Sequence, residues 1–367
     1  MERAIPGFKP ALSRAESAAL AQAFASGWVG TGLYAKLFER QFAAFAGARF
    51  ATGTNSGTAA LHLALRAAGV EGGEVITTPL TNAATSHAIL YNRAAPVFCD
   101  VEAETGNIDP GKIESLITPR TRAIVAVHLH GRAAAMDAIL ALARRRRLRV
   151  VEDACQALRG TFRGRPLGTL GDFGCFSFGR AKSLTTVQGG AIVAREKRWI
   201  PLLRRLCRLG YSEEGESVSE PGLIRELGFH CGLGDTAAAI GLAQLERWGA
   251  IEARLRALTA RYRRGLAGLP WLRLPESAPG SEPGWSHFAV RTAPGRRDRL
   301  ARWLQGRGIG AEVWLYPNHF YILYKPYRKK LPVAERLWRE FWSLPFYPAL
   351  RDEEADRVAD AIRRFKA

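Results

Sequence analysis

The sequence has few cysteines, and their positions exclude several classes of protein. Cys99, Cys155, Cys175, Cys207 and Cys231 lie far apart, and none belongs to a C-x-x-C pair. This spacing favours neither a disulfide framework nor a zinc ribbon. We therefore expect all five to be ordinary thiols of a hydrophobic core.

Long apolar runs are also missing. No stretch reaches the roughly 18 apolar residues that a membrane-spanning helix needs, and the start, MERAIPGFKP, lacks the apolar core of a secretion signal. We expect no membrane span and a cytoplasmic protein. The 367 residues, 47% hydrophobic and 24% charged, are typical of a globular chain with about two domains.

Lysine is scarce in a strongly basic chain. The formal net charge is +19, yet only nine of the 53 basic residues are Lys. The densest arginine run, 144–147, precedes an apolar strand pattern, where cations complement the C-terminal end of a helix. No reader motif or basic–aromatic alternation accompanies the charge, so we expect no nucleic-acid partner. A compact anionic ligand is compatible with it.

Short β-rich runs alternate with helical patterns from residue 50 to about 195. This alternation predicts βα crossovers and a mainly parallel sheet covered by helices on both faces, which is an α/β fold. The expected strands are Glu74–Pro79, Pro96–Val101, Ala123–His128, Arg149–Ala154, Cys175–Gly179 and Ala191–Ala194, separated by helices such as Thr58–Ala68 and Ala133–Arg146.

The last third of the chain has a different pattern. A long helical stretch is expected from Asp235 toward Arg264, followed by strands at His287–Arg291 and Gly310–Trp314 between helices. This order predicts a large α/β domain over residues 1–245 and a smaller α+β domain over residues 246–367.

A turn that can hold an anion follows the strand-like segment ATGT. Ligands of open α/β sheets bind at the carboxyl ends of the strands. Ser56, Gly57 and Thr58 lead from that segment into a helix, where free backbone N–H groups, hydroxyls and the helix dipole suit a phosphate group. The alternative is that Ser56 serves only as a helix cap.

A carboxylate and an amine follow two of the later predicted strands. Asp153 ends an apolar strand, where a carboxylate is costly unless it meets a cation or several donors, although it would also suit a helix cap. Lys182 stands between a buried strand and a Gly-Gly turn, in a chain that otherwise prefers arginine. Because lysine can lose its proton and arginine cannot, a free amine at this position requires lysine. A surface lysine in a loop is the alternative.

Other catalytic motifs are weak or missing. His128 and His130 alternate on a predicted strand and would share a face, as metal ligands might, but no third ligand accompanies them, and we expect no metal site. The common motifs of serine hydrolases, zinc proteases and P-loop proteins do not occur.

A phosphate cup, a buried Asp and a loop Lys, spaced 97 and 29 residues apart, describe a site for pyridoxal phosphate. At this constellation the chain resembles the DegT/DnrJ/EryC1/StrS family of sugar aminotransferases, which depend on pyridoxal 5'-phosphate (PLP) and have the fold type I architecture. The resemblance covers essentially the whole chain, through SGWVGTG, NSGTAALHLAL, APVFCDVEAETGNIDP, AIVAVHLHG, VVEDACQA, GTLGDFGCFSF, AAAIGLAQLE and SLPFYPAL.

The resemblance implies a role for each matching residue. Lys182 would hold the cofactor as a Schiff base and later move a proton between the substrate carbon and the cofactor. Asp153 would pair with the pyridinium nitrogen, which keeps the ring an electron sink. Gln156 would contact the phenolic oxygen of the ring. The phosphate would be bound by Gly57, Thr58 and Ser177, with Ser56 in the same turn.

Four positions depart from the family pattern. Asn82 stands where an aromatic residue commonly stacks on the pyridine ring, and Gln188 stands where Glu is usual. His230 replaces an Asn that normally reaches the partner subunit's cofactor phosphate, although it could still donate a hydrogen bond there. Gly232 replaces an Arg. These changes leave Lys182 and the phosphate cup in place and suggest an unusual branch of the family.

The resemblance therefore predicts a homodimeric aminotransferase with active sites at the dimer interface. The expected donor is an amino acid, most simply L-glutamate, and the expected acceptor is a keto-sugar, most simply nucleotide-linked, in amino-sugar, surface-glycan or secondary-metabolite biosynthesis. The first alternative is a PLP-dependent sugar dehydratase of the same fold, against which Lys182 counts because the dehydratase branch carries His there. The second is a catalytically weak regulatory or scaffold protein.

Overall fold

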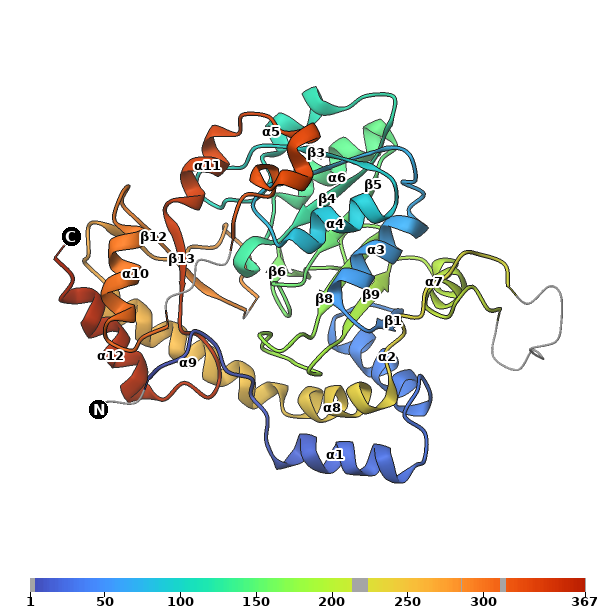
Figure 1. Cartoon of the computed structure of the whole chain (residues 1–367), viewed down its shortest axis with the longest axis horizontal. Helices are drawn as coiled ribbons and strands as arrows, with labels where there is room; N and C mark the ends of the chain where they lie inside the picture. The colour runs from blue at the N-terminus through green and yellow to red at the C-terminus, as the bar shows by residue number, and fades with distance from the viewer. Residues whose placement is uncertain (1–3, 213–223, 285, 311–314, 367) are drawn as a thin grey trace.

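The computed structural model describes residues 4–212, 224–284, 286–310 and 315–366, and its centre is a seven-stranded sheet (Figure 1). The strands lie in the order β1-β9-β8-β5-β4-β2-β3. Every pairing is parallel except those of β9, which runs antiparallel to both β1 and β8. The bounds are β1 (Ala51–Thr54), β2 (Glu74–Thr77), β3 (Ala95–Phe98), β4 (Thr121–Val127), β5 (Arg149–Asp153), β8 (Phe173–Ser177) and β9 (Gly190–Ala194).

The apolar composition of these strands explains why the sheet is buried between helices. A parallel sheet is covered on both faces, so its strands are apolar almost throughout. In β4 and β5 every residue after the first two is buried, and all of β9 is buried. The α/β fold and each predicted strand of this sheet are confirmed, with ends that differ by a few residues.

Helices cover both faces of the sheet (Figure 1). One face packs against α3 (Gly57–Ala67), α4 (Ala83–Tyr91) and α7 (Trp199–Cys207), and the other against α2 (Leu33–Phe45), α6 (Met136–Arg146) and α8 (Asp235–Glu246). The helix α1 (Arg14–Ala25) lies along α8, where the buried Glu16 carboxylate accepts a hydrogen bond of 2.6 Å from Gln244 Nε2. The arginine run does end a helix, since Arg144, Arg145 and Arg146 form the last turn of α6.

The C-terminal third forms a second layered unit. Its three-stranded antiparallel sheet has the order β10 (Leu272–Arg273), β12 (Phe288–Thr292), β13 (Phe341–Leu344), with α9 (Trp248–Leu266), α10 (Arg297–Gln305) and α12 (Asp352–Arg363) around it. Helix α11 (Pro332–Trp338) packs back beside β3, where Leu337 and Phe98 share an apolar cluster (Figure 1).

The remaining elements of the described residues are short. The strands β6 (Thr161–Phe162), β7 (Arg165–Pro166) and β11 (Ser281–Glu282) form a small ribbon that links the two units. The remaining helices are α5 (Pro110–Ile113) and four 3₁₀ turns, Glu114–Leu116, Leu129–Gly131, Asn318–Phe320 and Ile322–Tyr327.

Several sequence expectations are refined here. The long helical stretch consists of α8 and α9, which meet at Arg247 (ψ 0°). The predicted strand at 310–314 lies outside the described residues after Gly310, and a division near residue 245 stays a prediction. The N-terminal segment joins the C-terminal unit, because Ile5 N donates to Gly308 O at 2.8 Å. No helix among the described residues is both long and apolar enough to cross a membrane.

Candidate active site

A cavity of about 210 Å³ opens at the carboxyl ends of β5 and β8, where the first turns of α3 and α4 also converge. Both helix N-termini direct their backbone N–H groups and positive dipole ends toward this region. Residues from five segments line the cavity: Asn55, Ser56, Gly57, Thr58, Leu61, Asn82, Ala84, Thr85, Asp153, Cys155, Gln156, Ser177, Gly179, Lys182, Gln188 and Gly189. The structure thus brings together every predicted site residue except His230.

Asp153 is a buried carboxylate with neutral partners. It ends β5 with 5% of its surface exposed. Thr85 Oγ1 donates to Asp153 Oδ2 at 2.7 Å, and the Cys155 backbone N–H donates to Oδ1 at 3.2 Å. No Lys, Arg or His nitrogen of the described residues lies within 4 Å of this carboxylate. A buried carboxylate without a cation is costly, so the site suits a ligand that carries positive charge, such as a pyridinium.

Lys182 is held at the tip of a hydrogen-bonded loop after β8. Phe178 N donates to Gly189 O at 2.8 Å, and Thr186 N donates to Phe178 O at 2.9 Å, which closes the loop around the lysine. Burial lowers the pKa of Lys182 below 10.5, although electrostatic interactions with Cys155 and Asp153 act in the opposite direction. A larger fraction of the amine is therefore unprotonated near neutral pH, as attack on an aldehyde requires.

The turn before α3 forms a cup, and the position at its base, Gly57, has room only for glycine. The Ser56 hydroxyl caps the helix by accepting from Ala59 N at 3.1 Å, so the cap interpretation of its side chain is correct. Gly57 N and Thr58 N have no acceptor among the described residues. A Cβ on Gly57 would lie 2.7 Å from Ser177 Cβ, so glycine is required where β8 meets the cup. Two free amides beside two hydroxyls fit a phosphate group.

Asn82 has a clear structural role as a helix cap. It is the N-cap of α4, and its Oδ1 accepts from Ala84 N at 2.9 Å. Its side chain is exposed at the cavity wall. An aromatic residue at this position would lose the cap, which is worth about 1 kcal/mol.

Gln156 is oriented by a backbone donor. His130 N donates to Gln156 Oε1 at 3.0 Å, which fixes the amide so that its NH₂ group is the end left for a ligand. Such a donor suits the phenolic oxygen that the resemblance assigns to it. Gln188 lines the cavity as well and is exposed.

His230 lies outside the cavity of its own chain. Its side chain is exposed, and its backbone pairs with Arg208 in a short antiparallel bridge. The neighbouring Gly232 pairs with Thr54 at the end of β1. This position agrees with a role outside the chain's own site and leaves the predicted contact to a partner subunit untested.

The pairing of His128 and His130 on one strand face is wrong. Strand β4 ends at Val127, and His130 adopts the left-handed conformation with φ 54°. His128 Nε2 lies 2.9 Å from the buried Glu152, whereas the ring of His130 packs 5.3 Å from the Phe341 ring. The chain leaves the extended conformation after Val127, so the two imidazoles have different neighbours. No group of three metal-binding side chains occurs among the described residues.

Two residues of the cavity and one residue near Lys182 are not predicted from the sequence as site residues. Thr85 holds Asp153, and its only local signal is its place one turn after the cap residue Asn82. Cys155 lines the cavity and is not fully buried, so the expectation of an ordinary core thiol is wrong for it. His287 has no sequence signal; burial and the charge of Lys182 lower its pKa to about 3.

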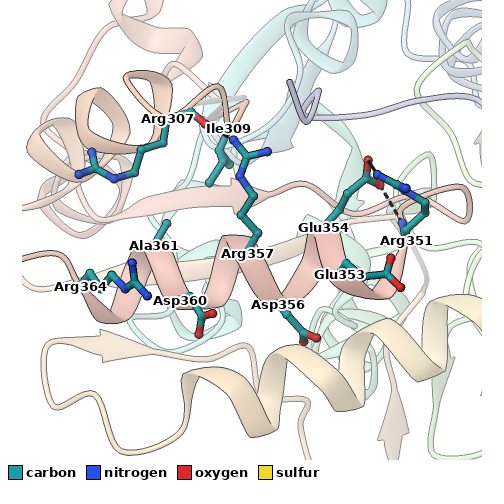
Figure 2. A pocket seen from close by; sticks show the side chains of 10 residues that line it. All are labelled: Arg307, Ile309, Arg351, Glu353, Glu354, Asp356, Arg357, Asp360, Ala361 and Arg364. Atoms are coloured by element: carbon teal, nitrogen blue, oxygen red, sulfur yellow. Dashed lines mark hydrogen bonds and ion pairs between the residues drawn. The ribbon is translucent and has the colours of Figure 1, made fainter. Parts of the chain in front are cut away.

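A second hollow, of about 700 Å³, lies on the outer face of α12 (Figure 2). Its charged lining contains equal numbers of the two signs: Arg307, Arg351, Arg357 and Arg364 against Glu353, Glu354, Asp356 and Asp360. Arg351 and Glu354 pair with each other at 3.1 Å. No lysine or deep carboxylate belongs to it, and we assign it no chemistry.

The fold and the lysine cavity define a PLP-dependent transferase of fold type I. The sequence model described as the DegT/DnrJ/EryC1/StrS aminotransferase family matches residues 10–363. The chain belongs to this family and is a PLP-dependent aminotransferase.

Individual relatives are similar to this chain over nearly its whole length. The spore coat polysaccharide biosynthesis protein SpsC of Bacillus subtilis is 34% identical, with 98% of this chain and 96% of SpsC covered. The crystal structure of S. venezuelae DesV in complex with a ketimine intermediate has a TM-score of 0.91 at 36% identity, covering 99% and 98% of the two chains. DesI, solved in the presence of its TDP-sugar product, has a TM-score of 0.91 at 32% identity, covering 99% and 93%.

Proposed function

We propose that this aminotransferase moves an amino group from an amino acid, L-glutamate in the simplest case, to a nucleotide-linked keto-sugar. The observation that supports the site assignment is that one cavity contains both Lys182, whose pKa is lowered, and Asp153, whose carboxylate forms no ion pair within 4 Å among the described residues. When bound, PLP supplies an electron sink for the carbon that loses or gains the amino group.

Each residue of the cavity would contact a different part of the cofactor. Lys182 would hold the cofactor through its amine and, once released, carry a proton at Nζ. Asp153 would accept a hydrogen bond from the ring N–H, and Thr85 would keep that carboxylate in place. Gln156 would donate from its amide, and the N–H groups of Gly57 and Thr58 with the Ser177 hydroxyl would bind phosphate.

The acceptor is inferred from charge and from the relatives. DesI is solved with a TDP-sugar product, and SpsC is named for polysaccharide biosynthesis. A net charge of +19 favours an acceptor that carries a diphosphate. These observations support a nucleotide-linked sugar in amino-sugar, surface-glycan or secondary-metabolite biosynthesis, with the sugar and the carbon left open.

The decisive experiment is a panel assay. Purified protein with PLP, glutamate and a set of nucleotide keto-sugars is analysed by mass spectrometry for an amino-sugar product. Exchange of a carbonyl oxygen for an amino group supports the proposal. Loss of water without gain of nitrogen would favour the dehydratase alternative, and absence of cofactor binding would favour the scaffold alternative.

We further propose a homodimer in which His230 reaches the partner's cofactor phosphate. Large apolar side chains are exposed close to this histidine: Trp28 is 60% and Leu33 66% exposed, and Leu227 is 75% exposed. The segment around Trp28 adjoins Gly232, because a Cβ on Gly232 would lie 2.9 Å from Thr31 Oγ1. Such a patch on a globular chain favours a protein partner.

Subunit mixing tests the shared site. Lys182→Ala and His230→Ala proteins, each shown to be inactive alone, are mixed under conditions in which subunit exchange is verified. Activity should return in the mixture, because hybrid dimers contain one intact site. Verified exchange without recovered activity would contradict the shared site and leave the aminotransferase assignment unaffected.

A further inference from the structure

Another hollow, of about 600 Å³, lies where the large α/β unit meets the C-terminal unit. Residues that follow β3 and β4 form one side of it, and residues of α9, β10, β12 and β13 form the other. None of the described residues lines both this hollow and the cofactor cavity. We call it the arginine pocket, because its charged lining consists of four arginines and two glutamates: Arg132, Arg263, Arg273, Arg291, Glu104 and Glu276.

Arg132 is a buried cation whose hydrogen-bond partners are neutral. It is 5% exposed, its Nη2 donates to Thr105 O at 2.7 Å, and its Nη1 donates to Glu104 O at 3.4 Å. Its Nε has no partner, and it forms no ion pair within 4 Å, among the described residues. Burial, with the charge of Arg291 as a smaller cause, lowers the pKa of Arg132 to about 10. A buried cation in such surroundings is costly, and an anion beside it would reduce the cost.

Arg291 lies next to Arg132 on the same aromatic ring. The guanidinium carbons of Arg132 and Arg291 are 5.5 Å and 5.6 Å from the centre of the Phe341 ring. Arg291 is held in place by Glu340 at 2.9 Å and by the carbonyl oxygen of Ala103 at 2.7 Å. The ring attracts both cations, but the two cations repel each other. The inner end of the pocket therefore carries a concentration of positive charge.

The remaining charges of the pocket do not cancel this excess. Arg263 is exposed and forms no ion pair among the described residues, whereas Arg273 has Glu104 at 3.8 Å. Glu340, which lies outside the lining, is shared between Arg291 and Arg336, the second at 3.7 Å. The lining thus has two more positive than negative groups, which matches the charge of a phosphate monoester near neutral pH. The hollow on α12, in contrast, is balanced.

The size and the apolar lining of the pocket indicate an organic ligand. Leu272, Leu274, Pro275 and Ala278 also line it. A volume of about 600 Å³ is in the usual range for small-molecule sites and is much more than a phosphate ion fills. Guanidinium groups present paired N–H donors that match the oxygens of a phosphate group. The lining therefore combines donors for a phosphate with apolar surface for the rest of a molecule.

We propose that the arginine pocket binds a small organic molecule through a phosphate monoester group, with Arg132 and Arg291 as its anchors. The phosphate oxygens accept hydrogen bonds from these two guanidinium groups, and Arg263 and Arg273 add positive charge at the exposed side. Since the ligand contacts both units, its binding stabilises the folded protein. A sugar phosphate and a nucleotide are the two sources of this group. The site is separate from the cofactor cavity and does not depend on the proposed acceptor.

The first measurement is calorimetric titration of the PLP-loaded protein, in which the cofactor phosphate already occupies the cup. The probes are glucose 1-phosphate, thymidine monophosphate, inorganic phosphate and acetate. At least one ester should bind about tenfold more tightly than inorganic phosphate, because it also contacts the apolar lining, and acetate should bind more weakly than both. The tighter ester identifies the source. Esters that bind no more tightly than inorganic phosphate, or acetate that binds as tightly as an ester, would overturn the proposal.

The second measurement locates the site by substitution. Arg132→Met should weaken binding of the tighter ester by about tenfold or more, because the phosphate loses charged donors, and Arg263→Ala should weaken it by about threefold. Arg264→Ala is the matched control, since Arg264 is the next exposed residue of α9 and lies outside the lining. It should leave the affinity unchanged.

Thermal unfolding provides the accompanying readout. The ester should raise the melting temperature of wild-type protein and of Arg264→Ala, but not that of Arg132→Met. Equal ester affinity in wild-type protein and folded Arg132→Met would overturn the proposal. If Arg132→Met does not fold, equal ester affinity in Arg263→Ala and Arg264→Ala would overturn it.

Discussion

The proposed cofactor cavity is smaller than the hollow on α12, yet it contains the more reactive groups. The first measures about 210 Å³ and the second about 700 Å³. The smaller cavity contains a partly buried lysine and a carboxylate without a cation, whereas the larger hollow carries charges that balance one another (Figure 2). Uncompensated groups in a confined space, and not volume, distinguish the reactive region.

The backbone of the two regions differs as well. The cavity lies where β5 and β8 end and two helices begin, so that several N–H groups lack partners. The hollow lies along one side of the single helix α12, and its charged lining consists of long flexible side chains. The N-termini of two helices converge on the cavity, whereas the hollow has the N-terminus of one helix, beside the carboxylates of Glu353 and Glu354, which disfavour an anion.

The largest expected effect comes from the lysine of the cavity. Lys182→Arg keeps a positive charge but cannot present a free amine, so turnover should fall by about a thousandfold or more. Initial rates of amino-sugar formation measure the effect. Substantial turnover by this variant would remove the distinction between the two regions.

The next effect concerns the buried carboxylate. Asp153→Ala would remove the proposed charge-assisted hydrogen bond to the ring nitrogen, worth about 1.5–3 kcal/mol, so PLP affinity should fall roughly tenfold to a hundredfold, and the glutamate half-reaction should stop. Titration of the apo protein with PLP and single-turnover kinetics test both parts. A half-reaction at a near-normal rate would refute the role of Asp153.

A smaller effect is expected at the floor of the cup. Gly57→Ala places a Cβ 2.7 Å from Ser177 Cβ, and overpacking of this kind costs about 1–3 kcal/mol. PLP should bind about tenfold more weakly. Gly249→Ala, where a Cβ would meet nothing within 4 Å, is the matched control and should leave PLP affinity unchanged.

Substitution of Asn82 by an aromatic residue should have two opposing effects, loss of a helix cap and gain of ring stacking. Asn82→Phe loses the cap of α4, worth about 1 kcal/mol, while a ring at the cavity wall could contribute about 0.5–1.5 kcal/mol by stacking. The PLP dissociation constant should change by less than about threefold, and the melting temperature should fall. Asn82→Ser, which keeps a capping oxygen, should retain the melting temperature; equal losses in both variants would contradict the capping role.

The smallest effect is expected in the α12 hollow. Arg364→Ala and Glu353→Ala each change an exposed side chain of a balanced surface, so activity should stay unchanged and the free energy of unfolding should shift by less than about 0.5 kcal/mol. Chemical denaturation and initial rates are the measurements. A tenfold loss of activity in either variant would show that the hollow has a function.

The sequence predicts the parts of the site that are local in the chain. The Ser56 turn, Asp153 at a strand end and Lys182 before a Gly-Gly turn are each recognisable from their neighbours, and the sheet follows from apolar runs. The DegT/DnrJ/EryC1/StrS pattern connects these parts. Asn82 could be recognised as a departure from that pattern, but its capping bond is visible only in the structure.

Features that depend on contacts between distant segments could not be predicted. His287 approaches Lys182 across more than a hundred residues, and nothing near it in the sequence indicates this. The pairing of Arg208 with His230 depends on how the chain returns after α7. The separation of His128 from His130 depends on one left-handed residue, which a pattern of alternating side chains does not reveal.

The central claim, that Lys182 holds the cofactor, is tested most directly by borohydride reduction. Protein loaded with PLP is reduced and digested, and the modified peptide is sequenced by mass spectrometry. The cofactor should be fixed to Lys182, and the Lys182→Arg variant should carry no label. A label on Lys197, or no label on wild-type protein that contains PLP, would contradict the account.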